Sequence, residues 1–258
     1  MEIVAEVNTA GGVCGSTLQA ASAEGNDALV SLLLQGGADV NAAGGEHGNA
    51  LQGASMNGHT NTVQILLENG AQVDADGGIC GQVLRVASAK GHAEIVRLLL
   101  GHGAEVNASG IWGNALYAAC ANGYADIVGL LVQSGAEVNA MDAFYGSALQ
   151  AASAGGYTDI VRFLLENGAE ADIAGGYHTH SAVYVASEKG HTDVARLLLQ
   201  KGARYDAQGM YGDVTAAESL ARRCLDYIIL GGFGGGRHPA AIHEWDANWD
   251  KRAVLNLR

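Results

Sequence analysis

The sequence predicts an all-α solenoid, in which short helix–turn–helix units stack side by side and share one hydrophobic core. A phrase of about 33 residues recurs along the chain, and periods of this length indicate repeat architectures. Within each phrase, polar residues and glycines return at fixed positions, and apolar residues recur at helical spacing. The phrases begin at Val7, Val40, Val73, Val106, Val138 and Ala171, with an eroded copy from Tyr205.

The first helix of each unit is expected to begin at a polar residue and to end at a glycine. Serine and asparagine, which fill five of the six starting positions, are preferred N-caps, and residues 50–55 illustrate the small side chains that let neighbouring backbones approach. A glycine after the helix supplies the left-handed conformation of a helix C-terminus. The expected starts are Ser16, Asn49, Gln82, Asn114, Ser147 and Ser181, and the expected ends are Gly25, Gly58, Gly91, Gly123, Gly156 and Gly190.

The second helix carries the longer apolar stripe, as in the segment from Ile95 to Leu100. A further glycine closes it, and the Gly-rich stretch that follows is too short for a third helix, so we expect a turn or a β-finger there. No unit can bury its apolar face alone, so stacking is obligatory and a curved solenoid with projecting fingers results. The closing glycines are Gly37, Gly70, Gly103, Gly135, Gly168 and Gly202.

The organisation along the chain follows from where this pattern holds. Residues 1–230 are assigned to the array, with six full repeats over 7–204 and a degenerate repeat over 205–230. Residues 231–258 begin with a Gly-rich linker. Beyond it, Ile242, Trp245, Trp249 and Ala253 follow a helical period, and an extra cap, a disordered tail and an interaction segment all stay open for this part.

The repeat resembles the ankyrin repeat. The resemblance is carried by Gly-His, then Ile/Val-Val and Leu-Leu, then Gly-Ala-Asp/Glu-Val-Asn-Ala, while the usual Thr-Pro-Leu-His is replaced, for example by the residues 49–52. The Gly-Asn/Ser-Ala-Leu-Gln-Ala-Ala-Ser version is similar to arrays of filamentous fungi, often found at the end of large multidomain signalling proteins. The resemblance implies an ankyrin solenoid, a fungal source, a chain that is a fragment of something longer, and a concave surface made of finger tips and first helices.

Charge limits the class of partner. The net charge is −13, which argues against nucleic acid or an anionic membrane as the partner. No Lys or Arg precedes Arg85, so the N-terminal end is strongly negative. Two interpretations stand: the acidic residues keep the array soluble, or they attract a protein partner with a basic patch.

Cysteine usage and the lack of targeting signals bear on location. The four cysteines are scattered without a CxxC pair, and neither a signal peptide nor an 18-residue apolar run occurs. We therefore expect a soluble, reduced, cytoplasmic protein, with a nuclear location left open.

Aromatic residues gather in the fingers and first helices of the C-terminal half. In a chain with so few rings, such a cluster is typical of anchors for a partner; alternatively, each ring packs on its neighbouring finger. The expected partner-binding residues are Trp112, Tyr117, Phe144, Tyr145, Tyr177, His178, Tyr184, Met210 and Tyr211.

Sequence patterns that would indicate metal binding or catalysis are weak. His178 and His180 form a His-x-His that supplies only half a zinc site, so no metal, cofactor or catalytic residue is predicted. The Gly-His histidines are interpreted as scaffold: His59, His92 and His191. The preferred function is therefore a protein–protein interaction module and not an enzyme. The alternative is small-molecule binding or catalysis in a groove bearing Asp142, Tyr145, Tyr177, His178 and His180.

Overall fold

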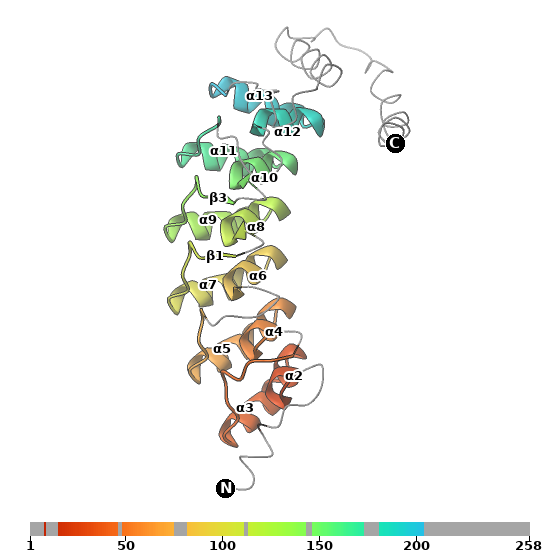
Figure 1. Cartoon of the computed structure of the whole chain (residues 1–258), viewed down its shortest axis with the longest axis vertical. Helices are drawn as coiled ribbons and strands as arrows, with labels where there is room; N and C mark the ends of the chain where they lie inside the picture. The colour runs from red at the N-terminus through yellow and green to blue at the C-terminus, as the bar shows by residue number, and fades with distance from the viewer. Residues whose placement is uncertain are drawn as a thin grey trace, which may run out of the picture.

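The described part of the chain is an elongated stack of six helix pairs (Figure 1). The computed structural model describes residues 8, 15–45, 48–74, 82–110, 113–142, 146–172 and 181–203. Twelve helices lie within these residues. The first helices of the pairs are α2 (Thr17–Ala23), α4 (Ala50–Asn57), α6 (Val83–Lys90), α8 (Ala115–Asn122), α10 (Ala148–Ala154) and α12 (Ala182–Glu188). The second helices are α3 (Asp27–Gln35), α5 (Thr60–Glu68), α7 (Ala93–Gly101), α9 (Ala125–Gln133), α11 (Thr158–Glu166) and α13 (Thr192–Gln200).

The helix starts confirm the predicted caps. Each first helix has the expected polar residue as its N-cap, and all except Gln82 accept a hydrogen bond from a backbone N–H of the first turn through the side chain. Ser16 and Ser147 form complete capping boxes with the glutamines three residues later.

The helix ends follow the predicted glycines with one variation. Gly58, Gly91 and Gly123 are left-handed C-caps of α4, α6 and α8. The helices α2, α10 and α12 end one residue earlier, and the positive-φ glycine comes directly after the C-cap. All six closing glycines of the second helices also have positive φ, between 85° and 90°.

The connecting segments form the expected fingers at two places. Strands β1 (Ser109–Gly110) and β2 (Gly113–Asn114) pair antiparallel, as do β3 (Met141–Asp142) and β4 (Gly146–Ser147). Each hairpin ends on the N-cap of the next first helix, so the finger and the helix are joined without a linker.

The core runs the length of the stack. Consecutive first helices contact one another, and so do consecutive second helices, which gives two layers. Buried Leu, Ile, Val and Ala from both layers form one continuous cluster from Leu18 to Ala203. None of the described helices has the length and apolar character needed to cross a bilayer.

A ladder of asparagines ties each connecting loop to the next. Asn41 donates from Nδ2 to the carbonyl of Gly70 (3.1 Å) and accepts from the backbone N–H of Gln72 (2.8 Å). Asn8, Asn107 and Asn139 each make the same pair of bonds, and their partners lie in the connecting loop one repeat later in the chain. Asp74 stands at this position in the third repeat and accepts from Glu105 N (3.1 Å), but a carboxylate has no N–H to give to a carbonyl.

A second ladder consists of rings that lie on glycines. The residue before each second helix packs against the first-helix glycine of the preceding repeat, so closely that a Cβ on Gly58 would lie 2.7 Å from Cε1 of His92. The ring–glycine pairs are His59 on Gly25, His92 on Gly58, Tyr124 on Gly91, Tyr157 on Gly123 and His191 on Gly156. All three histidines also donate from Nε2 to a carbonyl of the preceding repeat, at 3.0–3.2 Å. Their interpretation as scaffold is confirmed.

Two sequence-based expectations lie outside the described residues: the degenerate repeat over 205–230 and the segment 231–258. Residues 1–7 also lie outside them.

Candidate partner-binding surface

The third residue of the first helix α2 connects the helix layer to the finger that follows. Gln19 of α2 is 2% exposed, and its Nε2 donates to the carbonyls of Ala42 (2.8 Å), Gly48 (3.1 Å) and Gly44 (3.2 Å) in the finger that follows. Its Oε1 accepts from the backbone N–H of Ser16. One buried amide therefore fixes both the start of α2 and the shape of a finger. The same position is held by Gln52, Arg85, Tyr117, Gln150 and Tyr184.

Two of the predicted partner-binding residues, Tyr117 and Tyr184, occupy this bracing position. Tyr117 is half-buried, packs against the core, and lies so near Gly113 that a Cβ there would be 3.2 Å from its Cδ1. Tyr184 is only 7% exposed. Both rings come from first helices, as expected, but Tyr184 presents little surface in this structure. Their role in binding stays a prediction.

The remaining predicted residues lie outside the described part of the chain: Trp112, Phe144, Tyr145, Tyr177, His178, Met210 and Tyr211. The structure does describe the strands that flank some of them. Residues 111–112 connect Gly110 to Gly113, which pair across the first hairpin, and 143–145 connect Asp142 to Gly146, which pair across the second. Next to the second connection, Met141 is 42% exposed, an uncommon exposure for a large apolar residue among those that the structure describes. In the sequence, the aromatic positions 112, 144 and 145 thus fall between paired strands.

The N-terminal repeats carry the negative charge that the sequence indicates. Glu24, Asp39, Glu68 and Asp74 are exposed and Asp27 is half-buried, and no basic residue precedes Arg85 to neutralise them. Arg97 and Glu94 of α7 form an ion pair (3.4 Å), and both side chains are more than 60% exposed. Such an exposed pair contributes little to stability. Because it lies outside the first two repeats, it leaves their negative charge unneutralised.

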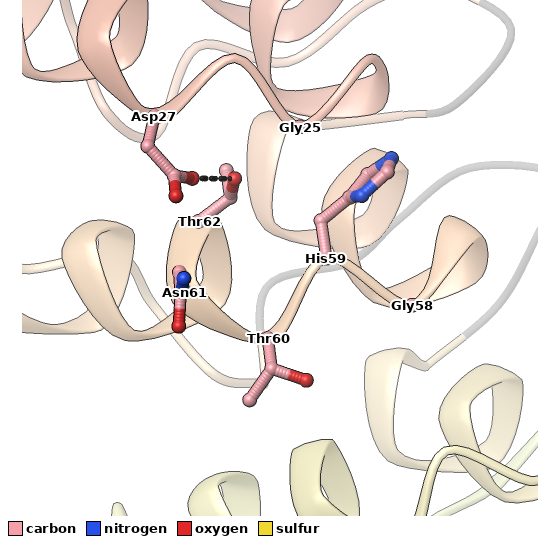
Figure 2. A pocket seen from close by; sticks show the side chains of 7 residues that line it. All are labelled: Gly25, Asp27, Gly58, His59, Thr60, Asn61 and Thr62. Carbon is pink, nitrogen blue, oxygen red and sulfur yellow. Dashed lines mark hydrogen bonds between the residues drawn. The ribbon is translucent and has the colours of Figure 1, made fainter.

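A cleft of about 290 Å³ lies at the N-terminal ends of α3 and α5 (Figure 2). It is lined by Gly25, Asp27, Gly58, His59, Thr60, Asn61 and Thr62. Asp27 accepts a hydrogen bond from the hydroxyl of Thr62, and His59 donates from Nε2 to Ala23 O. The carboxylate and that ring nitrogen therefore already have partners between repeats, which indicates a structural joint.

Within the described residues, no three His, Cys, Asp or Glu side chains converge in a way that would hold a metal ion. Cys120 lies in the core at 0% exposure, and burial raises the pKa of its thiol to about 12, so it stays protonated and is a poor nucleophile near neutral pH. The residues on which a catalytic groove would depend lie outside the described part, apart from the backbone of Asp142.

Comparisons with known proteins agree with this geometry. A family model described as "Ankyrin repeats (3 copies)" matches residues 17–110, 75–142 and 116–209, which together span well over half of the chain. Among solved structures, the chain is similar to the ankyrin repeat domain of human ASB11, with a TM-score of 0.71 and 23% identity over 86% of this chain and 100% of that one. At this identity the likeness bears on the fold alone. A search of curated proteins returns no significant match.

Proposed function

The chain belongs to the ankyrin-repeat family, whose domains generally mediate protein–protein interaction, and from that premise we propose that it binds a protein partner through its fingers and first helices. The single observation that carries the proposal is that aromatic residues occur in the sequence between paired strands: Trp112 between β1 and β2, and Phe144 and Tyr145 between β3 and β4. Large rings on a preorganised support are typical of interface hot spots.

The scaffold supports this role because it fixes where the fingers start. The hairpins end on the capped first helices, and the asparagine ladder joins successive loops. Rigid positions lower the entropy that binding must overcome. The binding set we propose is Trp112, Tyr117, Phe144, Tyr145, Tyr177, His178, Tyr184, Met210 and Tyr211.

The acidic N-terminal repeats are proposed to steer a partner that carries a basic patch. Glu24, Asp39 and Asp74 are exposed, and long-range attraction of this kind raises association rates more than it raises affinity. We therefore expect the association rate to fall when salt is added, while the dissociation rate changes little.

The test is a pull-down from a native extract with the wild-type array and three variants. Trp112→Ala and Tyr145→Ala should each lose the captured protein, with a melting temperature close to the wild type. His102→Ala is the matched control, because His102 is an exposed ring at the C-cap of α7 and does not belong to the proposed binding set, and it should retain the partner. Capture by all four proteins alike would sink the proposal.

The small-molecule alternative makes a different prediction in the same experiment. If the groove holds a metabolite, the small-molecule fraction of the wild-type eluate contains a compound that is missing from the His178→Ala eluate, and no protein is lost. Turnover that Asp142→Asn abolishes while binding persists would identify an enzyme.

A further inference from the structure

The third helix pair, α6 and α7, begins with a more weakly capped first helix than the other five described pairs. Gln82 is the N-cap of α6, and its side chain accepts no hydrogen bond from the first turn. The other five first helices start at a serine or an asparagine whose side-chain oxygen accepts such a bond. Because an N-cap bond stabilises a helix start, the first turn of α6 should open more readily than those of α4 and α8.

The loop that leads into this pair is also joined more weakly to the loop that follows it. Asp74 accepts a hydrogen bond from Glu105 N (3.1 Å), but its carboxylate has no N–H to donate. At the same position, Asn41 in the second pair and Asn107 in the fourth both accept and donate. The third pair therefore lacks one bond of the asparagine ladder.

Among the described pairs, the third is the one in which both changes occur together. Asp172 also places a carboxylate at the ladder position, but the first helix of that repeat, α12, is capped by Ser181. The fourth pair has asparagine at both positions, Asn107 and Asn114. The stability of a repeat array is a sum of terms for each repeat and for each interface between neighbours. A repeat in which two terms are weaker therefore limits how far one cooperative transition spreads.

The charge of the chain changes sharply at the same place. Residues 1–84 include nine acidic residues and no Lys or Arg, whereas residues 85–258 include 18 acidic residues and all 14 Lys and Arg. Like charges that are not neutralised repel one another and destabilise a compact state. The first two helix pairs and the loop at Asp74 should therefore be destabilised more by self-repulsion than the later pairs.

We propose that α2–α7 form one cooperative unit that unfolds while α8–α13 stay folded. The boundary follows the third pair, because the weaker cap and the missing ladder bond lie within that repeat, whereas the fourth repeat has both. The hairpins β1–β2 and β3–β4 follow α7 in the chain and lead into α8 and α10 (Figure 1). The acidic repeats can thus open and close while both hairpins keep a folded support. The proposal does not depend on the proposed function.

The experiment is native-state hydrogen exchange of the full chain at increasing urea below the main transition, read by mass spectrometry. Peptides from α2–α7 should lose protection together, at a lower urea concentration than peptides from α8–α13. The repair variant Asp74→Asn/Gln82→Ser restores the ladder donor and the cap. It should slow exchange in α6 and α7 by roughly tenfold and leave α10–α13 within about twofold of wild type.

The matched control places the same two defects in the next repeat. Asn107→Asp/Asn114→Gln removes the ladder donor and the cap of α8, so exchange in α8 and α9 should become faster by roughly tenfold. Salt gives an independent measurement. Raising NaCl from about 0.05 M to about 0.5 M screens surface charge, and it should increase the protection of α2–α7 more than that of α8–α13.

Three outcomes would overturn the proposal. If all the described helices lose protection at one urea concentration, the array is a single cooperative unit. If α12 and α13 lose protection first, the less stable unit lies at the other end of the stack. If the repair variant leaves exchange in α6 and α7 unchanged, the cap and the ladder bond do not set the boundary.

Discussion

The N-terminal repeats and the C-terminal repeats share one backbone plan but differ in the side chains placed on it. In both regions an asparagine joins successive loops, at Asn41 as at Asn139, and a ring lies on a glycine, at His59 as at Tyr157. The bracing position of the first helix holds Gln19 and Gln52 in the first two repeats, and then Arg85, Tyr117, Gln150 and Tyr184 in turn. The difference teaches that the two ladders are the constant part of the stack, whereas the bracing side chain varies between repeats, and we propose that the finger tips carry recognition.

The largest effect should come from breaking the ring–glycine ladder. Gly58→Ala places a Cβ 2.7 Å from the ring of His92 at φ +82°, so it should lower the free energy of unfolding by about 3 kcal/mol. Gly70→Ala is the matched control, because its φ is +85° but nothing lies within 4 Å of the added Cβ; it should lower that energy by only about 1 kcal/mol. Urea denaturation of both variants measures the difference, and equal losses would show that the ring contact contributes nothing.

The same pair of substitutions in the C-terminal half sharpens the comparison. Gly123 lies under Tyr157, and Gly135 has open space around it. If the ladder is common to both halves, Gly123→Ala should lower the free energy of unfolding by about 2 kcal/mol more than Gly135→Ala does, the same margin as in the N-terminal half.

An intermediate effect is expected at the bracing glutamine. Gln19→Ala removes donors to three finger carbonyls and should lower the free energy of unfolding by about 2 kcal/mol. Gln64→Ala, on the exposed side of α5, should change it by less than about 0.5 kcal/mol. Hydrogen exchange should also become faster around residues 42–48 in Gln19→Ala alone; protection retained there would mean that the finger does not depend on this amide.

The smallest effect should come from completing the asparagine ladder. Asp74→Asn adds the N–H donor that Asn41 has. By analogy with Asn41 and Gly70, its acceptor should be the carbonyl of Gly103, and the new bond should raise the free energy of unfolding by about 0.5–1 kcal/mol. The reverse change, Asn107→Asp, removes the bond to Gly135 O and should lower it by a similar amount. A destabilised Asp74→Asn would contradict the assigned role of this position.

Much of the fold could be predicted because it depends on local chemistry. Ser16 and Asn114 cap helices through bonds to residues three positions away, and Gly58 is left-handed because a helix ends there. Each repeat contains these capping residues, and their recurrence at the same positions strengthens the prediction. The role of the Gly-His histidines as scaffold followed from their replacement by Tyr124 and Tyr157 in other repeats.

The contacts between repeats could not be predicted in the same way. Nothing near Gln19 in the sequence indicates that its amide reaches the carbonyl of Gly48, 29 residues later. The 64% exposure of Leu32 could not be predicted either, because its position in the repeat looks like that of any internal second helix. The candidate site was predicted from the kind and position of its side chains, and the identity of a partner is not a local property of the repeat.

The most direct test of the central claim exchanges finger tips while keeping the scaffold. Residues 111–112 and 143–145 are replaced by Gly and Ser, and affinity for the partner recovered in the pull-down is measured together with the melting temperature. If rings on a constant scaffold carry recognition, affinity should fall by roughly a hundredfold while the melting temperature stays within about 2 °C of wild type. Retained affinity, or a melting temperature that collapses because the rings stiffen the array, would contradict it.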